Sequence, residues 1–163
     1  MVKNKIILLL LFIQSALWIS CDSTAVFDEY QSTGGEWLKD DVKSFNYHSK
    51  DSVGYYNMHI NLRADQNYPY SNIFLIVKTF QPDGNALVDT LQFEMAKPSG
   101  EILGKGLTDV KESTLWFKSK YRFKHLGAYK FDIEHAIRKS TSEHGDASLP
   151  GIKDVGLRIE KAQ

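Results

Sequence analysis

The sequence predicts an all-β fold: a single β-sandwich of about eight or nine strands, jelly-roll or immunoglobulin-like, that follows an N-terminal signal peptide. Three observations predict it. Residues 56–63 alternate apolar and polar side chains without exception, which is typical of a strand with one buried face. Residues 73–77 form a continuous apolar run too short for a helix, as expected of a strand covered on both faces. Turn-forming residues separate such runs at short intervals, as in sandwiches and barrels.

The first half of the chain contains two further expected strands. Residues 26–30 are expected to form the first strand, and the pair Gly34-Gly35 indicates a turn after it. Residues 43–48 alternate and are expected to form the next strand. Residues 67–72 then form an ordered loop in which a proline restricts the backbone.

The second half begins with a hairpin signal. Residues 82–85 read Pro-Asp-Gly-Asn, in which proline sets φ early in the turn and glycine takes the positive-φ position. Residues 87–95 alternate as the returning strand, and the glycines within 101–112 indicate a connection that crosses between sheets. The remaining expected strands are 114–118, 121–124, 129–134 and 155–160.

The N-terminus has the order of a secretory signal, which we assign to residues 1–20. Lys3 and Lys5 precede an apolar run, and the run is too short and too interrupted for the alternative, a permanent membrane-spanning helix. Ser20 supplies the small residue that a lipoprotein signal requires before its cysteine, although Trp18 stands where leucine is usual. We therefore expect cleavage before Cys21.

Cys21 is expected to carry a covalent lipid and to be the first residue of the mature protein. It is the only cysteine in the chain, so it has no disulfide partner and no cysteine metal cluster to join. Two or three acyl chains anchor a protein strongly, because each buried CH₂ contributes about 0.8 kcal/mol. We expect a lipidated tether at residues 21–25, a β-sandwich domain at residues 26–163, and no cofactor apart from the lipid.

Charge and motif content argue against several classes of function. Lys3 and Lys5 leave with the signal peptide while all 20 acidic side chains remain, so the mature chain offers no basic field for nucleic acid. Its five histidines show no metal-ligand spacing, and no nucleophile motif or phosphate-binding loop occurs. We expect no metal and no catalytic residue, with a calcium site at aspartate-containing turns as the open alternative.

Four aromatic residues are candidates for binding a partner: Tyr68, Tyr70, Trp37 and Trp116. Aromatic side chains often anchor interfaces, and the two tyrosines flank Pro69 in the expected loop. The alternative for each is that its ring packs onto the core.

Taken in order along the chain, these runs resemble the GldH family of gliding-motility lipoproteins from the Bacteroidetes. The most specific run is 65–75, Asp-Gln-Asn-Tyr-Pro-Tyr-Ser-Asn-Ile-Phe-Leu, and the family's lipidated cysteine corresponds to Cys21. The other matching runs are 37–41, 60–63, 89–91, 104–106, 115–116 and 152–159. The resemblance implies a non-enzymatic envelope lipoprotein that accompanies the gliding machinery and its linked protein-secretion system.

Two functional hypotheses follow. In the first, a lipid-anchored β-sandwich in the cell envelope docks on gliding or secretion proteins. In the second, an envelope carbohydrate-binding module uses exposed aromatic rings on a jelly-roll frame. Residues 23–26 lack the acidic run that marks surface-exposed lipoproteins of this phylum, so we expect the domain to face the periplasm, from the inner or the outer membrane.

Overall fold

Antiparallel strands make up the domain in the computed structural model, which describes residues 24–106, 108–136 and 147–163. The expected signal peptide and Cys21 lie outside these ranges. Within them, no helix is long and apolar enough to cross a membrane. The ten strands are β1 (Ala25–Ser32), β2 (Glu36–Leu38), β3 (Lys43–Ser49), β4 (Tyr56–Ala64), β5 (Asn72–Phe80), β6 (Ala86–Glu94), β7 (Lys111–Tyr121), β8 (Gly127–His135), β9 (Ser148–Pro150) and β10 (Ile152–Lys161).

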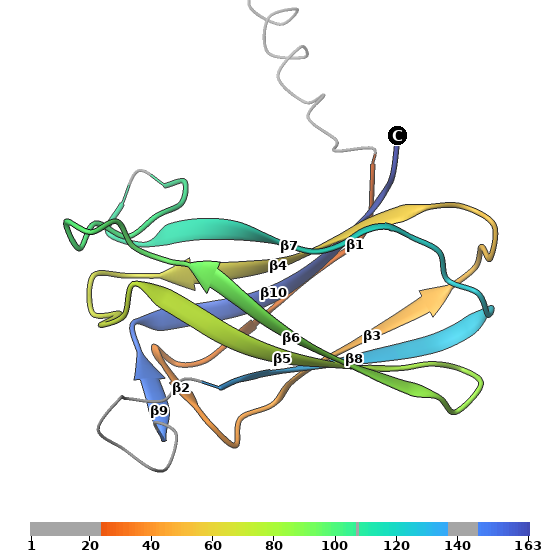
Figure 1. Ribbon diagram of the computed structural model, residues 1–163, viewed down its shortest axis with the longest axis horizontal. Helices are drawn as coiled ribbons and strands as arrows, with labels where there is room; N and C mark the ends of the chain where they lie inside the picture. The colour runs from red at the N-terminus through yellow and green to blue at the C-terminus, as the bar shows by residue number, and fades with distance from the viewer. Residues whose placement is uncertain (1–23, 107, 137–146) are drawn as a thin grey trace, which may run out of the picture.

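Two four-stranded sheets face each other and enclose the core (Figure 1). The first sheet has the order β1-β10-β4-β7, and the second has the order β3-β8-β5-β6. The short strands β2 and β9, which the sequence did not predict, pair only with each other. The all-β sandwich is therefore confirmed, with ten strands where eight or nine were expected.

The strand pairs are nested around one hairpin. β5 pairs with β6, and moving outward along the chain β4 pairs with β7, β3 with β8, β2 with β9 and β1 with β10. The chain thus behaves as one long two-stranded ribbon that rolls up, and the cross-pairs β10–β4 and β8–β5 close the two sheets. This arrangement is a jelly roll, which decides between the two topologies left open by the sequence.

The hairpin at the centre of this nest is the predicted turn. Gln81 N donates to Asn85 O over 2.8 Å, and Gly84 N donates to Gln81 O over 3.0 Å. Gly84 has φ +85°, a conformation that glycine adopts without steric cost. The Asp83 carboxylate accepts the Asn85 amide over 3.0 Å, so the turn is held by its own residues.

The core lies between the inner faces of the two sheets. Apolar side chains of β4 and β10, among them Ile60, Leu62 and Leu157, pack against Leu75 and Phe131 of the second sheet, and all five are fully buried. The alternation that predicts β4 and β10 therefore places their apolar residues inward, as expected.

Two central strands differ from expectation on their outward faces. β5 was expected to be covered on both faces, and this is wrong: Phe74 and Ile76, which point away from the core, are only half-buried. β4 was expected to be half-buried, yet its outward residues His59 and Asn61 are only 6% and 2% exposed. Side chains from the neighbouring strands β1, β7 and β10 cover this part of β4.

The strand expected at 114–118 is confirmed as part of β7, but the one expected at 121–124 is wrong, because only Tyr121 of these residues lies in a strand, at the end of β7. Lys120 has φ 49°, and the pairing with β4 shifts register near Met58. The irregularity allows the Lys120 amide to donate to Asn57 Oδ1 over 3.0 Å, so the strand continues to Tyr121.

One end of the sandwich is closed by a loop that packs directly on a glycine. Asp65 N donates to Gly151 O over 2.9 Å, and Gly151 N donates to Gly35 O over 3.0 Å. Gly151 has φ +85°, and a Cβ atom there would lie 2.7 Å from the carbonyl carbon of Asn67 and closer still to the amide of Tyr68. Only glycine fits this contact.

We expect Gly151→Ala to lower the free energy of unfolding by about 3 kcal/mol or more, because it adds a backbone clash to a strained φ. The matched control is Gly84→Ala, which has the same φ of +85° but open space around it, and which should cost about 1–2 kcal/mol. Urea denaturation of both variants measures the difference. Equal losses would show that the close approach at Gly151 contributes nothing.

Candidate functional site

Trp37 is part of the core and not of the surface. It lies in β2, fully buried, and its indole Nε1 donates to Asp41 O over 2.8 Å. Its ring packs edge-on against His135, with ring centroids 5.2 Å apart. The expectation of a partner-binding tryptophan here is therefore corrected: the ring seals the sandwich beneath the β2–β9 ribbon.

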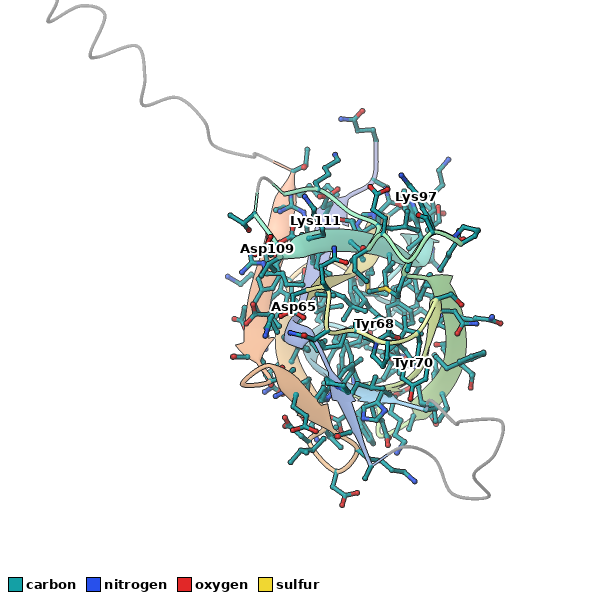
Figure 2. All side chains as sticks on the ribbon, turned by 90° about the vertical axis from the view of Figure 1, so that its left-hand side faces the viewer. Asp65, Tyr68, Tyr70, Lys97, Asp109 and Lys111 are labelled. Carbon is teal, nitrogen blue, oxygen red and sulfur yellow. The ribbon has the colours of Figure 1, made fainter. Side chains whose placement is uncertain are left out.

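Tyr68 also belongs to the core, which agrees with the alternative that its ring packs onto the core and does not bind a partner. It is 4% exposed, and its hydroxyl donates to Asn72 O over 2.7 Å. Burial raises the pKa of this phenol well above its usual range. Figure 2 shows Tyr68 and Tyr70 at the same end of the sandwich, where their rings meet edge-on with centroids 5.8 Å apart. Tyr70 is half-buried, so this loop offers little free aromatic surface.

Asp65 fixes the same loop to β10. Its carboxylate lies 2.8 Å from Lys153 Nζ and accepts the Asn67 amide over 2.9 Å. Burial alone would raise the pKa of Asp65, but the hydrogen bonds from Lys153 and Asn67 outweigh it and hold the pKa below its usual range. The run 65–75 is therefore explained by loop structure.

Trp116 is the only one of the four predicted aromatic residues with a mostly exposed ring. It lies on β7, points away from the core and is 57% exposed. The indole leans on the His59 imidazole of β4, with ring centroids 4.3 Å apart and planes at 59°. This contact holds the tryptophan side chain over the outer face of the first sheet.

The outer face of the first sheet is organised in rows that cross its four strands. Strand register places one residue from each strand in every row, in the order β1, β10, β4, β7. The first row is Asp28, Arg158, His59 and Trp116; the second is Tyr30, Gly156, Asn61 and Thr114; the third is Ser32, Asp154, Arg63 and Glu112.

A hollow lies along the second row, between side chains of the rows beside it. Gly156 has no side chain, and Thr114 is short. A Cβ atom on Gly156 would lie 2.8 Å from the ring of Tyr30, so the tyrosine lies directly over the glycine. The resulting hollow has a volume of about 360 Å³. It is lined by Asp28, Tyr30, His59, Asn61, Glu112, Thr114, Arg158 and Glu160.

A second hollow of about 550 Å³ continues from the first one. The two share His59, Glu112 and Thr114, and the second extends past Trp116 to the 103–105 segment. We call the two hollows together the outer groove. Its lining comes from β1, β10, β4 and β7, and from the end of β6 and the connection between β6 and β7.

The charged side chains around the outer groove are largely paired with one another. Arg158 forms ion pairs with Asp28 and with Glu160. Arg63 Nε lies 2.7 Å from the Glu112 carboxylate, and its guanidinium lies 4.2 Å from the centre of the Tyr30 ring. These contacts fix the positions of the walls, and carboxylates predominate in the lining.

Two buried polar atoms in the outer groove have no hydrogen-bond partner among the described residues: Asn61 Oδ1 and His59 Nδ1. Asn61 uses its amide Nδ2 to donate to the Tyr30 hydroxyl over 2.9 Å. Burial lowers the pKa of His59, and although Glu160 raises it and Arg158 lowers it, the net direction is downward. The imidazole is thus neutral at neutral pH.

The outer groove could not be predicted from the sequence. The alternation in 56–63 places His59 and Asn61 on the polar face of their strand, but nothing in that period shows that distant strands cover them. Among the described residues, no group of three or more histidine, cysteine, aspartate or glutamate side chains is placed to hold a metal ion.

Comparisons with known proteins match nearly the whole chain. A family model described as GldH lipoprotein matches residues 25–159. The Gliding motility lipoprotein GldH of Flavobacterium johnsoniae is 48% identical over 160 residues, which is 98% of each chain. The Gliding motility lipoprotein GldH homolog of Christiangramia forsetii is 46% identical over 146 residues, 90% of each chain.

One match to a solved structure is distant. The VP2 subviral particle of infectious bursal disease virus is 13% identical with a TM-score of 0.35. The match covers 86% of this chain and 34% of the viral chain, so this chain spans about a third of that protein.

We expect Tyr68→Phe to lower the free energy of unfolding by about 1–2 kcal/mol, because Asn72 O would lose its buried donor. The matched control is Tyr55→Phe, which removes the hydroxyl of a 56% exposed tyrosine and should change stability by less than about 0.5 kcal/mol. Thermal denaturation measures both. A Tyr68→Phe variant as stable as the parent would show that the hydrogen bond from the Tyr68 hydroxyl contributes nothing to stability.

We expect stability to fall as the pH is lowered through the range in which His59 would be protonated in the unfolded chain. The folded pKa of His59 lies below its usual 6.5, so the unfolded state binds the proton more readily and gains population below about pH 6.5. Urea denaturation from about pH 7.5 to about pH 5.5 should show this loss, and His59→Gln should reduce it. An NMR titration that places the His59 pKa at or above 6.5 would contradict the assignment.

Proposed function

This chain belongs to the GldH lipoprotein family, and from that premise we propose that it is a lipid-anchored, non-enzymatic component of the gliding-motility machinery and of the protein-secretion system linked to it. The observation that carries the proposal is the family match over residues 25–159, the whole β-sandwich. The relatives named for gliding motility match along nearly their full lengths, so the complete domain is shared with them.

The start of the domain supports a short tether. Cys21 precedes Thr24 by three residues, so the link between the lipid and the fold spans at most about 10 Å when fully extended. Thr24 O accepts the amide of Lys161 over 3.0 Å, and the amide of Ala162 donates to Tyr55 O over 2.8 Å. The beginning of β1, the end of β10 and the loop before β4 therefore lie together and face the bilayer.

The outer groove supports a binding role more than catalysis. Its arginines and carboxylates are joined in ion pairs that hold the side chains in place, and Asp28, Glu160 and Glu112 serve those pairs. General acid–base catalysis usually relies on two titratable groups whose pKa values are pushed apart at one reacting centre. In this proposal the domain presents surfaces to partners in the envelope, and the lipid supplies its location.

The test is complementation of a strain in which the gene has been deleted. Deletion should abolish colony spreading and reduce secretion in a gliding host. The parent gene should restore both, whereas Cys21→Ser should leave the protein without acyl chains and restore neither, because serine lacks the thiol that is acylated. Ser23→Ala, which leaves the signal and the cysteine intact, is the matched control and should behave as the parent.

Normal spreading and secretion in the deletion strain would contradict the proposed role. Recovery by the non-acylated Cys21→Ser protein would contradict the role of the lipid. Protease treatment of intact cells tests the orientation, because a periplasm-facing domain should survive it and a domain on the cell surface should be degraded. Crosslinking in membranes followed by purification of the tagged protein should identify gliding or secretion proteins as its neighbours.

A further inference from the structure

We propose that the outer groove binds a neutral oligosaccharide, with one sugar ring against the exposed face of Trp116 and sugar hydroxyl groups hydrogen-bonded to Asn61 and His59. This inference does not depend on the role in gliding, because it concerns a site and a ligand class that can be measured on the purified protein.

The first argument comes from the two unpartnered polar atoms. Asn61 Oδ1 and His59 Nδ1 belong to side chains that are 2% and 6% exposed, and both side chains line the hollow of about 360 Å³. A buried polar atom without a partner costs free energy, and native proteins contain few of them. Two such atoms at one hollow are the observation from which we infer a ligand, which would reach them when the side chains that cover them, Trp116 over His59 and Tyr30 beside Asn61, shift.

The hydrogen-bonding capacity of these atoms selects hydroxyl groups. Asn61 Oδ1 is an amide oxygen and can only accept a hydrogen bond, so the ligand must bring a donor, while Nδ2 of the same amide donates to the Tyr30 hydroxyl. A neutral imidazole has one donor and one acceptor nitrogen, and a hydroxyl group can serve either role at His59. A hydroxyl group therefore satisfies both residues, which a pure acceptor such as a phosphate cannot do.

The charged side chains around the first hollow also favour a neutral ligand. The carboxylates of Asp28, Glu112 and Glu160 line the first hollow, and Arg158 is the one cation among its lining residues. Arg158 is already paired with Asp28 and Glu160, and Arg63 with Glu112, so both arginines are engaged and give an anionic ligand little attraction. Carboxylates can accept hydrogen bonds from hydroxyl groups, so they can bind a neutral polyol.

The position of the groove argues against an extended peptide. The groove lies over the face of the first sheet, where the backbone groups of β4 are already paired with β10 and β7. A peptide that adds to a sheet needs a free strand edge, which this face does not offer. An exposed indole beside polar groups matches a sugar instead, because a sugar ring has a C–H face and a hydroxyl rim.

The extent of the groove favours an oligosaccharide over a single sugar. The hollow near Asn61 and the one beside Trp116 share His59, Glu112 and Thr114, so a ligand can continue from one to the other across Thr114. Their volumes of about 360 and 550 Å³ fall in the range of small-molecule sites.

The test is a titration of the mature lipoprotein in nanodiscs with chitotetraose, cellotetraose and maltotetraose, followed by calorimetry and by tryptophan fluorescence. At least one should bind and shift the emission of Trp116, since Trp37 is buried and Trp18 leaves with the signal peptide. Trp116→Ala should weaken binding about tenfold, the effect of losing one stacked ring.

The second variant, Thr114→Arg, places a long side chain across the groove floor and should abolish binding. Its matched control is Thr90→Arg, at an exposed threonine of β6 in the other sheet, which should bind as the parent does. Both sites are exposed, and thermal denaturation checks that both variants fold.

Absence of binding by all three oligosaccharides at 10 mM, a concentration on the order of weak glycan affinities, would overturn the proposal. Binding that survives Thr114→Arg would overturn the location. Trilysine is the competing probe, because an ammonium group can also donate to Asn61 Oδ1. Binding of trilysine, lost in Thr114→Arg, together with no oligosaccharide binding would make the groove a site for cationic peptides and overturn the proposal.

Discussion

The structure depends on one constraint: each strand pairs with the strand that is equally far from the other end of the chain. The hairpin of Gln81–Asn85 is the centre of this nest, and the β1–β10 pair is its outermost layer. Every pair outside the hairpin closes a longer loop, and loop closure costs more entropy as the loop lengthens. Packing of the two sheets must offset that cost, because the chain has a single cysteine and so no internal disulfide.

The outer groove is a product of the same pairing. Its rows combine residues from β1, β4, β7 and β10, which are far apart in the sequence and meet only because the ribbon rolls up. Because Gly156 of β10 has no side chain, the Tyr30 ring of β1 can lie across β10. Its hydroxyl thereby reaches Asn61 of β4. The face is polar, and its central residues His59 and Asn61 are nonetheless buried, although residues on β1 and β7 to either side are exposed.

Local periodicity predicted most of the strands but not their partners. Alternation in β4, β6 and β10 and the Pro-Asp-Gly-Asn turn were sufficient to predict those elements, because each pattern has a local physical cause. The burial of Trp37 and Tyr68 was not predictable, since a single aromatic residue in a short strand or a loop has no period. The burial of His59 and Asn61 could not be predicted for another reason. The side chains that bury them belong to strands distant in the sequence.

The shared position of the two ends of the domain has a mechanical consequence. A pull between the membrane and a partner bound at the opposite end of the sandwich would enter through Thr24 and run along β1, parallel to the strand. Antiparallel ladder bonds lie perpendicular to the strands, so such a force shears the ladder from Ala25 to Ser32 as a unit and does not open it bond by bond. The fold is thus attached to its anchor in the direction in which a β-ladder resists load best.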